Sequence, residues 1–358
     1  MAQIENWARP DISTLQAQIK KLTEPCIRDH VLLAMMRKRG RISYGHSGKN
    51  PKWRVKWRRF EPLPNDDMDT INAPRRNRYK EAELPWRSYR MAESYSKYET
   101  LVNQGKWALI KIVSQLAKDM AADANEYFAM ELYRNGDASG YTDRIHGLES
   151  VFTEADAAIS ASNTPCLAPS GTSYGGLNSV LGTYGGSWTT YWPLGTGPMR
   201  YHFWSPMIID HSATFWPDDS DEWKYTWQKC LRFAEMYQMK LHKKRVDLWL
   251  MDPELERQAK DSMLDKERVL VNSNDELKSL GFGKAWNWEG TPIMSEYGCT
   301  ADSAYGINWS ALELKSMQKQ LFATSNAPEW DVQAKKLDID FWGNLFISTP
   351  AHLCKITS

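Results

Sequence analysis

Cysteine is scarce in this chain, and no two cysteines lie close together. The 358 residues include five cysteines, every neighbouring pair is tens of residues apart, and there is no Cys-x-x-Cys. Zinc knuckles and thioredoxin-like centres need closer spacing, and an odd number of cysteines fits a disulfide scaffold poorly. We therefore expect reduced thiols, as in a protein made in a cytosol. The five are Cys26, Cys166, Cys230, Cys299 and Cys354.

Long apolar runs are also missing. No run approaches the roughly 18 apolar residues that a membrane-spanning helix needs. Residues 1–20 carry Glu5 and Asp11 and hold no apolar block. We therefore expect neither a signal peptide nor contact with a membrane.

The sequence lacks a catalytic set. Residues 171–175 match Gly-x-Ser-x-Gly, but prolines precede them and glycines follow, where a nucleophile elbow needs a strand and then a helix. We expect a mobile loop there instead. The seven histidines form no His-x-x-x-His or Glu-x-x-His pair, His146 is expected to be structural, and no carboxylates are paired for acid–base work. We expect no enzymatic activity, no metal and no cofactor.

Charge is distributed unevenly along the chain. The net charge is only +1, but residues 1–100 hold 21 Lys and Arg against 12 Asp and Glu, and the remaining residues hold 24 against 32. Ten basic residues and no acid lie between Arg37 and Phe60. Such a basic segment is expected to meet either a polyanion or an acidic surface of a partner.

Tryptophan is abundant, at 17 residues. Trp53 and Trp57 interleave with the basic residues of 37–59, a pattern in which cations neutralise phosphates and rings stack on bases. The alternative is a strand with one wet face whose cations pair with acids on a neighbouring subunit. The tryptophans otherwise favour a core or an interface over a sugar-binding platform.

The helical pattern predicts one unusually long helix and several shorter ones. Apolar residues recur every three or four positions over 99–134, which predicts a helix on the order of 50 Å long at ~1.5 Å per residue. Residues 11–39 predict two short helical pieces. Acidic residues precede a helix at about 219–242, and Asp252-Pro253 begins another that ends near Leu264.

Residues 41–98 predict a long hairpin with no cover of its own. Strands are expected at 52–60 and 84–95, joined by a broad polar tip. An isolated hairpin is marginal in water, so we expect another subunit to cover this one. Further strands, scattered without βαβ alternation, predict an α+β fold. They are expected at 246–251, 267–272, 291–297, 303–309, 311–323 and 333–348.

Taken in order, several segments resemble landmarks of one family over nearly the whole chain. They are 52–60, 83–95, 99–105, 145–149, 173–177, 246–253, 290–293, 305–308 and 342–350. The chain resembles the major capsid protein of tailed bacteriophages, which has the Hong Kong 97-like fold. The resemblance implies an N-terminal arm at 1–40, an extended loop at 41–98, and an axial domain at 151–319. It also implies a peripheral domain at 99–150 and 320–358 that carries the long spine helix.

The resemblance also implies a function and partners. Such a subunit self-assembles into hexameric and pentameric capsomers of an icosahedral shell around double-stranded DNA, forming the virion capsid, and is made in the cytoplasm of the host bacterium. A portal and decoration proteins belong to shells of this kind. Only about ten residues precede the first expected helix, so we expect a separate scaffolding protein.

The expected contact between subunits is the extended loop. Its aromatic side chains would be buried on a neighbour, and its cations would find acids across the boundary. These residues are Trp53, Arg54, Trp57, Arg58, Trp86 and Arg87. Near the arm, Arg37, Lys38 and Arg39 are expected to face DNA. Two alternatives are a monomeric nucleic-acid-binding protein that uses the 37–59 strip, and a carbohydrate-active enzyme, which the lack of paired carboxylates disfavours.

Overall fold

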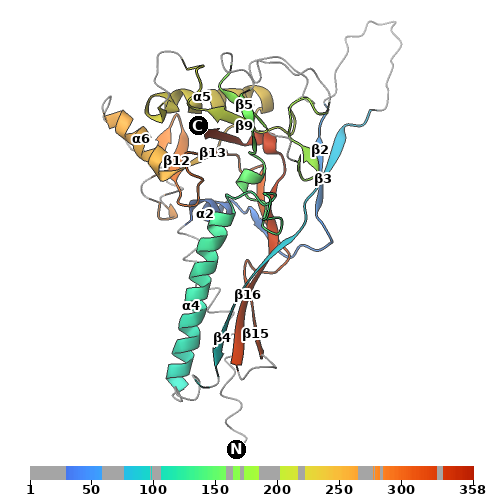
Figure 1. The fold of residues 1–358 in the computed structure, drawn as a ribbon, viewed down its shortest axis with the longest axis vertical. Helices are drawn as coiled ribbons and strands as arrows, with labels where there is room; N and C mark the ends of the chain where they lie inside the picture. The colour runs from blue at the N-terminus through green and yellow to red at the C-terminus, as the bar shows by residue number, and fades with distance from the viewer. Residues whose placement is uncertain are drawn as a thin grey trace, which may run out of the picture.

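The computed structural model combines helices with two large β-sheets (Figure 1). The residues that it describes are 30–58, 76–96, 98, 106–158, 164–169, 173–184, 202–216, 222–264, 277, 279–282, 285–328 and 334–358.

The first sheet is built around one long strand, β16 (Ala334–Ile347). Gly343 of β16 pairs with β14 (Leu312–Ser316) and also with β4 (Arg87–Ser96), so these two antiparallel strands flank it on opposite sides. β15 (Ala323–Pro328) pairs with the earlier part of β16, and β1 (Ile42–Ser43) runs parallel to β14.

The long helix α4 (Lys106–Glu131) lies beside this sheet (Figure 1). Its 26 residues span about 39 Å at ~1.5 Å per residue. Leu337, Ile339 and Phe341 alternate along β16 and are buried, and the ring of Phe341 lies 4.6 Å from that of Phe128 on α4. The predicted long helix is therefore confirmed, and its apolar stripe covers one face of the sheet.

The second sheet has eight strands in the order β11-β12-β10-β13-β17-β9-β6-β5. β17 (Cys354–Thr357) lies inside it, antiparallel to β13 (Ala304–Ile307) and parallel to β9 (Met207–Asp210). The other strands are β5 (Glu154–Ala158), β6 (Cys166–Pro169), β10 (Leu248–Met251), β11 (Trp286–Trp288) and β12 (Thr291–Ser295).

Both faces of the eight-stranded sheet are buried. Successive side chains of β10 point to opposite faces. Leu248 and Leu250 join the core that includes α4 and β16, whereas Trp249 and Met251 join a second, tryptophan-rich core. Helices α5 (Trp223–His242) and α6 (Pro253–Leu264) cover that second core. One sheet therefore links the two cores.

Local sequence signals set the ends of both helices. α6 begins at Pro253, and Glu254 and Glu256 lie in its first turn, where negative charge is favourable. α5 ends where Lys243 adopts a left-handed conformation with φ of 56°. Two short 3₁₀ helices, η2 (Leu148–Ser150) and η4 (Pro350–His352), lie after α4 and after β16 in the chain.

The arm is described only at its end. α2 (Val31–Lys38) buries six apolar residues, and the earlier part of the predicted 11–39 helical region lies outside the described residues. The expected strand at 267–272 also lies outside them. The expected strand at 311–323 is instead two strands, β14 and β15, separated by residues 317–322.

The predicted return strand of the hairpin is wrong. β2 (Lys52–Lys56) pairs with β3 (Tyr79–Glu83), not with residues 84–95. Pro85 interrupts the chain after β3, and the segment beyond it forms β4, which pairs with β16 over ten residue pairs. The alternating pattern of this segment correctly indicated a strand, but not its partner. The strand pairs with β16 because Tyr89 and Met91 then pack on the core.

Residues 173–178 also differ from the expected mobile loop. β7 (Ser173–Tyr174) and β8 (Leu177–Asn178) form a tight hairpin. Gly175 and Gly176 occupy its turn with φ of 60° and 75°, which is the backbone that a two-residue type I′ turn requires.

Each of the two large sheets draws strands from both of the expected domain ranges, whose limits stay a prediction. β14 joins β16 in the first sheet although it falls in the expected axial range, and β17 joins the second sheet although it falls in the expected peripheral range. The long-range pairing of β17 with β9 and β13 is invisible in a linear reading of the sequence.

Candidate functional site

The β2–β3 ribbon presents two chemically different faces. Trp53 and Val55 on β2 lie opposite Ala82 and Lys80 on β3, and this face turns toward the body of the molecule. The other face is exposed and carries Lys52, Arg54 and Lys56 opposite Glu83, Glu81 and Tyr79. The predicted strand with one wet face is therefore confirmed.

The apolar face of the ribbon packs on the same chain. The Trp53 ring lies within 6.5 Å, centroid to centroid, of the rings of Tyr174, Trp204 and Phe346. Trp53 Nε1 donates a hydrogen bond to the Ser348 carbonyl at 3.0 Å. The end of the ribbon that carries Trp53 and Glu83, which we call its root, is therefore anchored in this subunit's own core.

The β7–β8 turn at Gly175 packs closely against this end of the ribbon. Glu83 N donates to Gly175 O at 3.1 Å. A Cβ on Gly175 would lie 3.3 Å from both Ala82 Cβ and Trp53 Cη2, so a side chain at residue 175 would require the ribbon or the turn to move by a few tenths of an ångström.

Side chains complete the edge of β16 beyond the end of β4. The buried Tyr174 hydroxyl accepts from Ile347 N at 3.0 Å and donates to Leu345 O at 3.2 Å. Asn344 Nδ2 donates to Pro85 O at 2.9 Å. A buried strand edge needs partners for its backbone groups, and the Tyr174 hydroxyl supplies them where no strand does. The Asn344 side chain instead satisfies the carbonyl of Pro85, just before β4 begins.

Trp86 is also covered by its own chain, whereas an uncovered loop was expected. Trp86 Nε1 donates to Gly48 O at 3.0 Å, and its ring lies 5.8 Å from that of Phe346. Trp57 also packs, partly buried, against the core. The expectation that this chain leaves its loop tryptophans uncovered is therefore wrong, because Trp53, Trp57 and Trp86 all have contacts within the subunit. Their assignment to a contact between subunits stays a prediction.

Two polar atoms near the ribbon lack partners. Trp57 Nε1 and Arg87 Nε are buried, and neither has a hydrogen-bond acceptor among the described residues. A buried polar group without a partner is costly, so an acceptor from elsewhere would be stabilising at both places.

The exposed charge of the ribbon becomes more basic away from its root. Lys52 lies 3.2 Å from Glu81 and 3.0 Å from Glu83, so both acids are close to this one lysine. The described segments 52–58 and 76–83 contain seven cations and only these two acids. Besides Lys52 the cations are Arg54, Lys56, Arg58, Arg76, Arg78 and Lys80.

The basic triplet lies at the end of the arm helix. Arg37, Lys38 and Arg39 are all exposed, and Lys38 Nζ donates to Ser279 Oγ at 2.7 Å. The triplet and the β2–β3 ribbon are thus separate basic surfaces on different elements. Their relation to DNA stays a prediction.

An acidic stripe runs along the outer side of α4. Asp119, Asp123 and Glu126 are exposed at helical spacing, while Ala117, Met120 and Ala124 face the core. The sequence pattern revealed the buried side of this helix, but the outer side carries the charge that a basic partner would meet.

A buried carboxyl joins the arm to the rest of the molecule. Glu296 Oε2 accepts from Leu32 N at 3.0 Å and from the Tyr133 hydroxyl at 2.6 Å, and His30 Nδ1 lies 3.8 Å from Oε1. Burial raises the pKa of the Glu296 carboxyl to about 7, and the two hydrogen bonds only partly oppose this. Sequence reasoning missed this residue, since Leu32 and Glu296 are 264 positions apart.

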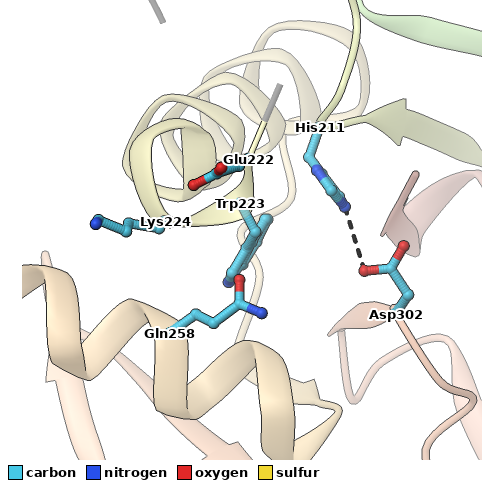
Figure 2. A pocket seen from close by; sticks show the side chains of 6 residues that line it. All are labelled: His211, Glu222, Trp223, Lys224, Gln258 and Asp302. Atoms are coloured by element: carbon cyan, nitrogen blue, oxygen red, sulfur yellow. Dashed lines mark hydrogen bonds and ion pairs between the residues drawn. The ribbon is translucent and has the colours of Figure 1, made fainter. Parts of the chain in front are cut away.

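A histidine–aspartate pair was missed as well. His211 Nε2 lies 3.3 Å from Asp302 Oδ1 beside an open cavity of about 400 Å³, and Figure 2 shows the two side chains pointing toward each other. The remaining lining residues are Glu222, Trp223, Lys224 and Gln258. None of the lining residues described carries a hydroxyl or thiol nucleophile, so the cavity does not support acyl transfer by a catalytic triad.

His146 is buried beside Tyr174, with its ring 6.0 Å from the tyrosine ring, as expected for a structural histidine. Within the described residues, no three His, Cys, Asp or Glu side chains are grouped so as to hold a metal ion. No helix in this part of the chain is long and apolar enough to cross a membrane.

Comparison with known proteins links this fold to viral shells. No protein-family model and no curated sequence matches the chain. Among solved structures, the cyanophage A-1(L) capsid asymmetric unit matches with a TM-score of 0.58 and 14% identity, over 88% of this chain and 89% of that one. The capsid of a native GTA particle matches with a TM-score of 0.56 and 10% identity, over 90% and 89%. The predicted α+β class is confirmed, and the chain has the fold of these phage-type capsid proteins, as its sequence resemblance implied.

Proposed function

We propose that this protein is a major capsid protein that self-assembles into the icosahedral shell of a tailed bacteriophage around double-stranded DNA. The observation that carries the proposal is the capsid fold, which covers 88% of the chain. Hexameric and pentameric capsomers of this chain would form the virion capsid. Subunits would be made in the cytoplasm of the host bacterium, with a separate scaffolding protein, a portal and decoration proteins as partners.

In this proposal each of the two large sheets forms one domain of the subunit. The sheet around β16, with α4, would be the peripheral domain, and the eight-stranded sheet with α5 and α6 would be the axial domain. Sheet membership supports assigning β14 to the first part and β17 to the second. Residues 1–40 would be the arm, and 41–86 the extended loop and its root.

The outer face of the ribbon would contact a neighbouring subunit. The ribbon's inner face is already packed on its own body, so the polar face is the one available for the contact. Arg54 and Arg58 would then supply the charge of the contact.

The acidic stripe of α4 offers the complementary surface. Asp119, Asp123 and Glu126 are exposed and spaced along one side of a rigid helix, so cations on a neighbour's ribbon can lie against them. Exposed ion pairs contribute little singly, typically about 0–1 kcal/mol each. A shell repeats the contact in every subunit, so small contributions suffice to guide assembly.

Size measurement is the primary test of the proposed function. We would co-express the chain with candidate scaffolding proteins and examine the product by sedimentation and negative-stain electron microscopy. Capsomer rings or closed shells are expected. A chain that stays monomeric with every partner tried, at high protein concentration, would contradict the proposal. Closed shells formed by the chain alone would instead contradict the need for a separate scaffolding protein.

Charge exchange tests the ribbon contact. Arg54→Glu places an acid opposite the acidic stripe and is expected to reduce the yield of shells several-fold. Asp123→Arg in the same chain should restore part of that yield, because the pair is then reversed. Lys319→Glu, a charge reversal at an exposed residue between β14 and β15, is the matched control. Equal losses in Arg54→Glu and Lys319→Glu, with no rescue, would show that the contact is placed wrongly.

The exposed cations at the end of α2 support a DNA-facing surface. Free subunits should bind duplex DNA in a salt-sensitive way, and replacing Arg37, Lys38 and Arg39 by glutamine should weaken binding and flatten its salt dependence. The basic ribbon keeps a second candidate function open, a monomeric nucleic-acid-binding protein that uses the 37–59 strip. Tight duplex binding by a strictly monomeric chain would favour that alternative.

A further inference from the structure

Three of the seven histidines meet at the end of α5. The ring of His242, the last residue of α5, lies 5.3 Å from the ring of His202 and 5.6 Å from that of His352, measured between centroids. His202 precedes β9, and His352 is the last residue of η4, shortly before β17. We call these three residues the histidine cluster. It joins three segments that are far apart in the sequence.

The contact between α5 and η4 at this cluster is buried. Gln238 Nε2 on α5 donates to the carbonyl of Leu353 at 3.1 Å, and both residues are buried. His202 is buried too, and His242 and His352 are half-buried. Neutral imidazole rings can pack in such a place, whereas a buried charge is costly unless an opposite charge accompanies it.

The charge that surrounds the histidine cluster is mainly positive. The cations at this end of α5 are Lys240, Lys243, Lys244 and Arg245. Glu235 lies two turns before His242, but its carboxylate accepts from Trp249 Nε1 at 3.2 Å and acts on the buried Cys354 thiol. Asp247 accepts from Trp309 N at 2.9 Å. A proton taken up by the cluster would therefore add charge beside cations.

His352 is the member whose protonation the folded chain opposes. Burial and, to a smaller extent, the charge of Lys244 lower the pKa of its imidazole from 6.5 to about 4. A contact that opens would expose this ring to water and let it bind a proton. The contribution of the neutral ring to the closed contact is therefore complete above pH 6.5 and is lost as the pH falls toward 4.

We infer that the histidine cluster is an acid-operated joint, at which proton uptake by His352 separates the end of α5 from η4 while the rest of the subunit stays folded. Local opening is easiest at the ends of elements, and both contacting segments are ends. The pairs that β17 makes with β13 and β9 begin at Cys354, so the sheet does not depend on residue 352.

The joint acts in the opposite direction to Glu296. Burial favours the protonated carboxyl of Glu296 and the deprotonated ring of His352, and the two groups lie on different elements. A measurement on the whole subunit would mix the two effects, so a local measurement is needed. The inference does not rest on the proposed function, because the joint lies within one chain.

Hydrogen exchange measured by mass spectrometry gives the local readout. Dissociated full-length subunits would be compared at about pH 7.5 and about pH 5, in peptides that cover 238–245 and 349–356. After correction for the intrinsic rate, opening of both segments is expected to increase by roughly an order of magnitude in acid. Peptides from α6 are the internal control and should show no such increase.

Variants assign the effect to His352. His352→Phe keeps a ring but binds no proton, so it is expected to remove most of the acid-induced increase. Lys244→Gln removes the cation that acts on His352, and it should reduce the increase by about twofold or more. Lys240→Gln removes another cation from the same helix end and is the matched control, with an increase like that of the unchanged protein.

Three results would overturn the inference. They are no acid-induced increase in the two segments, an equal increase in His352→Phe, and an increase of the same size in α6, which would mean that acid loosens the whole subunit. If His352→Phe does not fold, exchange throughout the chain at pH 7.5 reveals it, and Lys244→Gln decides. A smaller increase in Lys244→Gln than in Lys240→Gln then supports the joint, and equal increases contradict it.

Discussion

The indole nitrogen of Trp53 lies 3.0 Å from the carbonyl oxygen of Ser348, to which it donates a hydrogen bond across 295 positions of the sequence. The bond joins the first strand of the ribbon to the residue that follows β16. The ribbon is therefore built into the body of its own chain at its root.

Trp53→Ala should destabilise the isolated subunit. The substitution removes a ring that touches three others and leaves the Ser348 carbonyl without its donor, so we expect a loss of about 2–4 kcal/mol in the free energy of unfolding. Urea unfolding of dissociated subunits measures it. Trp342→Ala, which removes an indole that is 46% exposed, is the control and should cost much less. Equal losses would show that Trp53 is not anchored as described.

Gly175→Ala should loosen the root of the ribbon more than Gly176→Ala does. Both glycines have positive φ, so each substitution costs roughly 1 kcal/mol or more in backbone strain. Only at Gly175 would the new Cβ also press on Ala82 and Trp53, at 3.3 Å each, whereas nothing lies within 4 Å of a Cβ at Gly176. Thermal unfolding of both variants isolates the crowding, and a larger loss at Gly176 would contradict it.

Glu296 should make stability depend on pH. Burial raises its pKa to about 7 from 4.5, so between these values the folded state holds a proton that the unfolded state releases. The contribution of this group is therefore greatest below pH 4.5, falls as pH rises to about 7, and then stays constant. Tyr133 and Cys299 also face the carboxyl, and burial raises the pKa of each above its ordinary value, so they titrate above this window. His30 Nδ1 lies 3.8 Å from Glu296 Oε1.

Glu296→Gln isolates that contribution. The amide oxygen can still accept from Leu32 N and the Tyr133 hydroxyl, because both donate to the same oxygen. Compared with the unchanged protein, the variant should become more stable by up to a few kcal/mol in the free energy of unfolding as the pH rises from 4.5 to 7. Glu126→Gln, at an exposed carboxyl, should show no such trend. A parallel pH profile for Glu296→Gln would contradict the assignment.

The described cysteines should resist modification in the folded protein. Cys166, Cys230, Cys299 and Cys354 are buried, and burial raises the pKa of the Cys166 thiol to about 12. Since the thiolate is the reactive form, alkylation should be slow in native buffer and fast in denaturant. Mass spectrometry of iodoacetamide-treated Cys26→Ser protein, with and without urea, measures this. Rapid native labelling of any of the four would show that its surroundings open readily.

Local patterns predicted the elements well and their partners poorly. The stripe of α4, the acidic and proline starts of α5 and α6, and the apolar run of β10 all depend on neighbouring residues, and each element is found near its expected limits. The partner of β4 is different, because an alternating strand is equally compatible with β2 and with β16. Only the three-dimensional arrangement, with Phe341 and Tyr89 on one face, selects β16.

For the candidate site too, the sequence predicted local features but not the contacts between distant segments. The sequence identified the alternation of Trp53 and Trp57 with cations, which the ribbon confirms. It did not show that Tyr174 and Gly175 receive the ribbon, because these residues lie about a hundred positions away and their pattern resembles an ordinary loop. Glu296 and the His211–Asp302 pair were missed for the same reason, since each joins segments distant in sequence.

The interior position of β17 sets the order in which a newly made chain can finish folding. β11, β12, β10 and β13 lie on one side of this strand, and β9, β6 and β5 lie on the other. The two halves of the sheet cannot be joined until residues 354–357 have left the ribosome. Until then the strands β11, β12, β10 and β13 form one part and β9, β6 and β5 form another, and no strand joins them.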